Sequence, residues 1–141
     1  MKVLEKAKGS RSTFRRLTQR KGFKSFKNLL EAKYAHHTQT VLSMSDLAPK
    51  VYGEIQEKKG RWGYYTEFAK TITCNPNHCT CGKCEDIEEA MQDEIDDLVG
   101  NIEDCGYLFS DCHVGNVGYV TRNGKSVLVC IDTGEESLEE L

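Results

Sequence analysis

Three polar residues in one short loop, and a fourth at the end of an apolar run, are the residues of this sequence best suited to chemistry. Asp111, His113 and Asn116 fall within the stretch SDCHVGN, and Asp132 follows the apolar run SVLVCI. Carboxylate and amide oxygens are the hard ligands that Mg²⁺ prefers. The same residue types also hydrogen-bond tight turns, so a purely structural role stays open for each of them.

The elements around these residues can be read from spacing. The stretch 85–105 is a strongly amphipathic helix that leads into the polar loop, and Gly106 suits its C-terminal cap. Its apolar stripe consists of Ile87, Met91, Ile95, Leu98, Ile102 and Cys105. After the loop, Asn123-Gly124 predicts a hairpin between strands 117–121 and 126–131. The hairpin would carry the chain from Asn116 to Asp132.

Upstream, the pattern predicts a helix over 25–44, capped by Ser25 and stopped before Pro49. Two strands follow, over 49–55 and 62–69, joined by a glycine turn. The order is therefore helix, two strands, cysteine-rich loop, helix and hairpin.

The residues SDCHVGN and CIDTG resemble the catalytic core of the protein-kinase-like superfamily. In aminoglycoside and choline kinases the catalytic loop reads D-x-H-x-x-N and a later strand ends in I-D-x-G; small kinase-like proteins of tailed phages are similar. The resemblance implies that Asp111 is catalytic and orients the acceptor hydroxyl. It implies that Asn116 and Asp132 hold Mg²⁺ on the ATP phosphates, and that His113 braces the loop. Phosphoryl transfer depends mainly on such positioning and charge neutralisation.

The implied fold class is α+β: a minimal, C-terminally truncated kinase-like fold with a reduced N-terminal lobe and a Cys-rich loop. We expect one domain, 1–141. Its expected segments are a basic N-terminal segment (1–24), the reduced N-terminal lobe (25–70), the Cys-rich loop (74–84), the catalytic-loop region (85–134) and an acidic tail (135–141). That tail cannot replace the helices that normally follow in the family, so a partner protein could supply the missing surface.

Nucleotide-binding residues are also implied. The backbone near Glu67 and Ala69 would form the hinge that holds adenine, and Glu31 lies where the family has its helix glutamate. A partner lysine should lie on a strand before that helix. STFRRLT is the strand-like candidate, and it offers Arg15 and Arg16; arginine replaces lysine poorly at a fixed site. There is no G-x-G-x-x-G motif.

Four cysteines, Cys74, Cys79, Cys81 and Cys84, could provide a tetrahedral zinc site. Redox-active thiols or disulfides are the alternatives. Cys105, Cys112 and Cys130 are expected to pack as small hydrophobic residues.

Charge is unevenly distributed along the chain. Residues 1–37 contain eleven Lys or Arg and two acids, whereas residues 85–104 contain ten acids and no Lys or Arg. The basic end could contact phosphates or pair with the acidic helix of the same chain. The sequence has no apolar run long enough to cross a membrane and no signal peptide. We therefore expect a cytoplasmic protein without a membrane partner.

Three functions stay open. The first is an atypical kinase that binds Mg-ATP and transfers phosphate to a hydroxyl acceptor. The second is a catalytically weak or inactive kinase-fold protein, phage-encoded in one reading, that binds and modulates a host protein. The third is a zinc-containing module that binds nucleic acid through the basic N-terminus.

Overall fold

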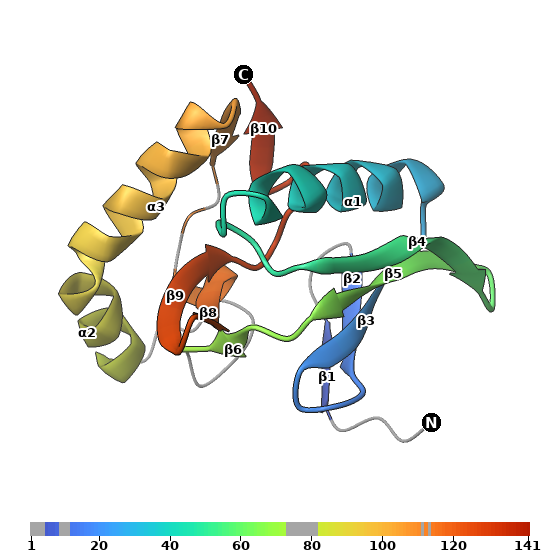
Figure 1. The fold of residues 1–141 in the computed structure, drawn as a ribbon, viewed down its shortest axis with the longest axis horizontal. Coiled ribbons are helices and arrows are strands. Elements are labelled where there is room, and N and C mark those ends of the chain that lie inside the picture. Colours follow the sequence, from blue (N-terminus) through green and yellow to red (C-terminus); the bar gives the residue numbers. More distant parts are fainter. Residues whose placement is uncertain (1–4, 9–11, 73–81, 111, 113) are drawn as a thin grey trace.

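The first half of the chain forms a five-stranded antiparallel sheet. The computed structural model describes residues 5–8, 12–72, 82–110, 112 and 114–141. Within them the sheet contains β1 (Glu5–Lys8), β2 (Ser12–Arg16), β3 (Lys21–Phe26), β4 (Val51–Lys58) and β5 (Arg61–Glu67). The strand order is β1-β2-β3-β5-β4 (Figure 1). Residues 1–24, predicted as a basic N-terminal segment, thus hold β1, β2 and the first four residues of β3.

Helix α1 (Leu29–Ser43) covers one face of this sheet (Figure 1). The prediction that it begins at Ser25 is wrong, because Ser25 belongs to β3 and the side chain of Asn28 caps the helix by accepting from the Leu30 backbone N–H. Ala32 and Ala35 of α1 pack against Phe26 and Tyr64 of the sheet. Small helix residues let the helix approach closely, and the aromatic rings fill the remaining space.

The predicted hairpin is present. It consists of β8 (Val117–Arg122) and β9 (Lys125–Cys130), and β6 (Lys70–Thr71) pairs with β8 to make a three-stranded sheet. Asn123 and Gly124 form the two-residue turn with φ angles of 53° and 77°. Both residues need positive φ, which is why Asn-Gly predicts this turn so well.

The predicted helix 85–105 is two helices, α2 (Gly82–Ala90) and α3 (Gln92–Asp104), which are separated at Met91. We have no physical account of that break. Ile95, Leu98 and Ile102 are the buried residues of α3, as the stripe predicted. Gly106 ends the helix with a φ of 96°, and its N–H donates to the Glu103 carbonyl.

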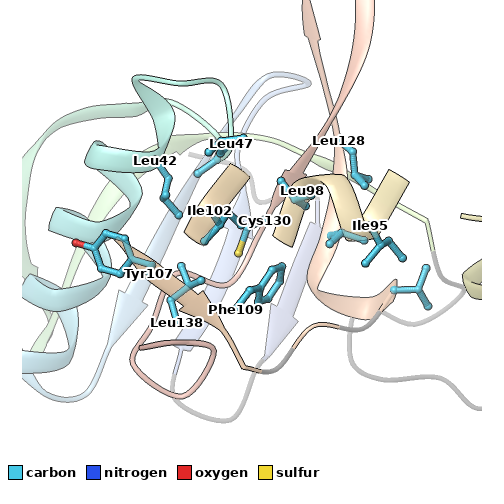
Figure 2. Packing of buried hydrophobic residues seen from close by; sticks show 13 residues of the cluster. Leu42, Leu47, Ile95, Leu98, Ile102, Tyr107, Phe109, Leu128, Cys130 and Leu138 are labelled. Carbon is cyan, nitrogen blue, oxygen red and sulfur yellow. The ribbon is translucent and has the colours of Figure 1, made fainter. Parts of the chain in front are cut away.

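Residues 135–141 do not form the expected acidic tail. They contain β10 (Leu138–Glu140), which pairs antiparallel with β7 (Tyr107–Phe109). Figure 2 shows Leu138 among Ile102, Tyr107 and Phe109 in the larger hydrophobic core. Among the described residues, no helix is long and apolar enough to span a membrane.

Candidate functional site

A buried lysine on β3 is the centre of the candidate site. The side chain of Lys24 is on the same face of the sheet as the core beneath α1, and only 6% of the residue is exposed. Its Nζ donates to the carbonyl oxygen of Ile131 at 3.2 Å, which joins the five-stranded sheet to the end of the hairpin. Ile131 directly precedes Asp132 in the chain. The lysine therefore reaches the segment that was predicted to hold Mg²⁺.

The expectation that STFRRLT is the strand before the helix is wrong, because β3 lies between it and α1. Lys24, and neither Arg15 nor Arg16, occupies the buried position. Arg15 is exposed, and the guanidinium of Arg16 lies 3.8 Å above the ring of Phe68. The available signal was the stretch KGFKSF, a short strand-like run placed directly before the helix.

Lys24 keeps its positive charge despite its burial. Burial alone lowers the pKa of its ammonium, but Tyr64, Asp132, Cys130 and Glu136 together raise that pKa above the ordinary value. The carboxylates of Asp132 and Glu136 are the acidic groups in this set. The charged ammonium is the group here that can bind the oxygens of a phosphate, through charge-assisted hydrogen bonds.

Asp132 is held in place by its own turn. Its Oδ1 accepts the Gly134 N–H at 3.0 Å, and its carbonyl accepts the Cys130 thiol. Glu136 hydrogen-bonds the Asp132 side chain, and burial together with the charge of Asp132 raises the pKa of Glu136. Gly134 permits this approach, because a Cβ there would overlap the Glu136 carboxylate. Sequence reasoning missed Glu136, which was assigned to the tail.

Asn116 is brought next to Asp132 by the backbone. It ends a short 3₁₀ helix, η1 (Val114–Asn116), and its carbonyl accepts the Ile131 N–H at 2.8 Å. Asn116 directly precedes the hairpin and Asp132 follows it, and this backbone bond brings the two residues to the same end of the hairpin. Asp111 and His113 lie outside the described residues.

A buried polar network surrounds the lysine on the side of α1. The Tyr64 hydroxyl donates to Oε1 of Gln39 at 2.8 Å, and Nε2 of Gln39 donates to Oγ1 of Thr66 and to the Pro49 carbonyl. Thr133, the neighbour of Asp132, donates to the Ala35 carbonyl at 3.0 Å. Glu31 lies in the first turn of α1 and is half-buried.

The predicted hinge connects the five-stranded sheet to the sheet that contains the β8–β9 hairpin. The Glu67 N–H donates to the Lys50 carbonyl at 2.8 Å, and the Phe68 N–H donates to the Arg20 carbonyl at 2.9 Å. The Glu67 side chain is used as well, because its carboxylate accepts two hydrogen bonds from Arg122 at 2.6 and 2.7 Å.

The other predicted hinge residue, Ala69, is buried against Val120 and Val129. In the five-stranded sheet, Gly22 leaves room for the ring of Phe14, which stacks on Phe68 with centroids 6.2 Å apart. Ala69 is therefore fixed against the β8–β9 hairpin, while the neighbouring Phe68 ring stacks on Phe14 of the five-stranded sheet.

A pocket of about 440 Å³ lies beside this hinge, between the β2–β3 turn and β8. Its lining residues are Arg16, Gln19, Arg20, Glu67, Phe68, Lys70, Tyr119, Val120 and Thr121. Neither Lys24 nor Asp132 lines it, so the pocket is separate from the charged centre. Its three cations and its aromatic side chains suit an anionic or aromatic ligand.

The donor atoms of the described residues fit Mg²⁺ better than zinc. The described residues contain no group of three or more His, Cys, Asp or Glu side chains that could hold a metal ion by themselves. Mg²⁺ needs few protein ligands and keeps several waters, so the oxygens of Asp132 and Asn116 fit it. Cys74, Cys79 and Cys81 lie outside the described residues, and only the backbone of Cys84 is described, so zinc stays a prediction.

No family model matches the sequence, and no curated protein sequence matches it. Solved structures do match its fold. The kinase PK-1 of Cydia pomonella granulovirus superposes with a TM-score of 0.57 at 14% identity, covering 99% of this chain and 55% of that one. WbdD, solved with the kinase inhibitor LY294002, superposes with a TM-score of 0.54 at 12% identity, covering 99% of this chain and 33% of that one.

These similarities show the fold. The chain is a small α+β protein with a kinase-like fold, as the sequence predicted. It spans about half the length of the granulovirus kinase (55%) and about a third of WbdD (33%).

Proposed function

We propose that this protein binds Mg-ATP in the cleft between the five-stranded sheet and the β8–β9 hairpin, and transfers the terminal phosphate to a hydroxyl acceptor. The observation that supports this most is Lys24, a buried charged lysine whose Nζ bonds the residue before Asp132. A buried ammonium beside carboxyl groups often stabilises a fold no more than apolar side chains of similar volume would. It does have a use where phosphate oxygens and a divalent cation must be held together.

Each residue would have one role. Lys24 would bind phosphate oxygens, since its ammonium donates charge-assisted hydrogen bonds. Asp132 and Asn116 would hold Mg²⁺, which supplies charge neutralisation between the phosphates when bound. Asp111, at the other end of the loop that ends in Asn116, would orient the acceptor hydroxyl and take up its proton. The chain would fix these groups through the Ile131–Asn116 backbone bond and the turn at Gly134.

A second candidate is a kinase-fold protein that binds a partner and catalyses weakly or not at all. One observation favours it. The N–H groups of Glu67 and Phe68 are already bonded to the Lys50 and Arg20 carbonyls, so they are not available to a base in this arrangement. Adenine recognition at the hinge would then depend on the backbone of Ala69 and on the aromatic ring of Phe14.

Calorimetric titration of ATP into the full chain, with and without Mg²⁺, separates these candidates when it is combined with a phosphate-transfer assay. We expect Mg-dependent binding that Asp132→Ala abolishes. Asp111→Asn should keep binding, because the amide preserves size and hydrogen bonding, while transfer is lost. Binding without transfer in the wild type would favour the second candidate, and no binding at all would reject the Mg-ATP proposal.

A further inference from the structure

The five-stranded sheet has a second face, turned away from α1, which we call the outer face. The register places Arg15 beside Phe23, Phe23 beside Tyr65, and Tyr65 beside Tyr52. One cation and three aromatic rings therefore form a continuous row across β2, β3, β5 and β4. Phe23 is buried, whereas Tyr52 is 39% exposed. No helix among the described residues packs over this row, since α1 contacts the side that carries Tyr64.

Two lysines hold their ammonium groups over these rings. Lys21 Nζ lies 4.6 Å from the ring centroid of Tyr65 and 5.7 Å from that of Tyr52. Lys58 Nζ lies 4.6 Å from the centroids of both Phe23 and Tyr65, and it donates to the Tyr65 hydroxyl. Cation–π contacts fix the positions of these charges on the surface.

Among the described residues, no acid forms an ion pair with the cations at the tip of the β4–β5 hairpin. Lys58 lies directly opposite Arg61 in the β4–β5 pairing, and Lys59 lies in the turn between them. Like charges directly opposite one another destabilise an antiparallel pair. Arg61 does not relieve this with a carboxylate, because its guanidinium bonds the hydroxyl and carbonyl of Ser25.

The acidic residues of these strands either pair with a cation or lie off the row of aromatic rings. Glu67 lies on the outer face, directly opposite Lys21, but its carboxylate pairs with Arg122. Glu57 lies opposite Trp62, on the face of α1, and Glu54 lies in the bulge between Tyr52 and Gln56. The outer face is consequently cationic with aromatic rings between its charges.

The basic surface continues beyond the outer face. Arg20 directly precedes Lys21 and lines the 440 Å³ pocket beside the hinge, where Lys70 also lies. A polyanionic chain bound across the outer face would therefore meet further cations at the β2–β3 turn.

We propose that the outer face of the five-stranded sheet binds single-stranded nucleic acid. The exposed ring of Tyr52 can stack a base, and the cations beside it can pair with phosphates, which is how sheet surfaces hold single strands. An acidic protein would use the cations but would leave the exposed Tyr52 ring without a base to stack on it. The proposal is independent of Mg-ATP binding and places nucleic acid on the sheet rather than on a zinc loop.

Fluorescence anisotropy of a labelled single-stranded RNA or DNA, titrated with the full chain at several salt concentrations, tests this. The dissociation constant should rise steeply with salt. Lys21→Gln should lower the slope of log affinity against log salt by about 0.7 for a lost phosphate contact. Tyr52→Ala should weaken binding by about fivefold or more at every salt concentration, because it removes a stacking ring. Lys33→Gln, which removes an exposed charge from α1 instead, should change neither.

Four results would overturn the proposal. The first is no binding at low salt. The second is that Lys33→Gln changes the salt slope as much as Lys21→Gln does. The third is that inorganic polyphosphate binds as tightly as the oligonucleotide and that Tyr52→Ala leaves the affinity unchanged. The fourth is a salt-sensitive dimer in sedimentation without oligonucleotide, which would assign the outer face to the acidic helices of a second copy.

Discussion

At the scale of one residue, Lys24 places a positive charge in the interior of the fold. Its ammonium is almost completely removed from water and makes one hydrogen bond to the Ile131 carbonyl. Burial by itself would lower its pKa, yet Asp132 and Glu136 are among the groups that keep it above the ordinary value. Lys24 is therefore charged at neutral pH, and phosphate oxygens arriving beside it would meet a cation that is already desolvated.

Replacing this lysine tests its role directly. Lys24→Met keeps the length of the side chain and removes the ammonium, so we expect the affinity for Mg-ATP to fall by about tenfold or more, since a hydrogen bond to a charged group contributes about 1.5–3 kcal/mol. Lys33→Met, an exposed substitution on α1, is the matched control. Calorimetry on variants shown by urea titration to be folded gives the comparison, and equal affinities would remove Lys24 from the site.

At the scale of elements, the pairing of β7 with β10 completes the larger core. β10 contributes Leu138, which is fully buried, and its backbone continues the two-stranded sheet beside α3. The Tyr34 hydroxyl of α1 donates to the Leu138 carbonyl at 2.7 Å, so the strand is tied to the first half of the chain as well.

Leu138→Ala should accordingly lower the free energy of unfolding by about 2–5 kcal/mol, because it leaves a cavity in a packed core. Leu141→Ala changes the same residue type three positions later, where 72% of the residue is exposed. That variant should stay within about 0.5 kcal/mol of the wild type. Urea unfolding monitored by the single tryptophan measures both, and two similar values would mean that β10 is not part of the cooperative core.

Local signals in the sequence account for some of these elements and not for others. The hairpin was predictable because Asn123-Gly124 can both adopt positive φ, and α3 was predictable from its apolar stripe. β3 was a weaker case, because the two phenylalanines of KGFKSF are three residues apart rather than two, and only tertiary contacts decide that Lys24 is buried. β10 has one apolar residue, Leu138, and becomes a strand through pairing with β7.

The candidate site divides in the same way. Asn116 and Asp132 were identified by resemblance to a known motif, and the backbone bond between Asn116 and Ile131 is consistent with that choice. Glu136 could not be found from sequence, because its approach to Asp132 depends on the turn at Gly134 and on burial. A short run of acidic residues carries no local sequence signal for the turn at Gly134 or for the burial of Glu136.

At the scale of the whole molecule, an ion-pair cluster joins the sheet to the hairpin. Arg122 of β8 binds Glu67 of β5 and also Asp46 in the loop after α1, at 2.6 and 3.0 Å. Burial by itself raises the pKa of the Glu67 carboxyl, but the hydrogen bonds from Arg122 and from the Lys50 backbone outweigh it, so that pKa lies below the ordinary value. Both charged side chains are mostly buried, which limits screening by salt.

A lowered pKa makes this cluster acid-sensitive. The unfolded Glu67 binds its proton near pH 4.3 and the folded one at lower pH, so the stabilisation is present above about pH 4.3 and is lost as the pH falls below it. Glu67→Gln should therefore lose less stability than the wild type between about pH 5 and pH 3. Parallel losses in urea titrations at both pH values would show that Glu67 does not contribute to acid unfolding.

The central claim concerns both halves of the molecule at once, because Mg-ATP would contact Lys24 on the sheet and Asp132 after the hairpin. The melting temperature of the full chain with ATP, measured with Mg²⁺ and with a chelator, tests it most directly. A ligand at one hundred times its dissociation constant adds about 2.7 kcal/mol, which for a chain of this size raises the melting temperature by roughly 5–15 °C. We predict that rise only with Mg²⁺ present, and its loss in Asp132→Ala. A wild-type melting temperature that does not respond to saturating Mg-ATP would contradict the account.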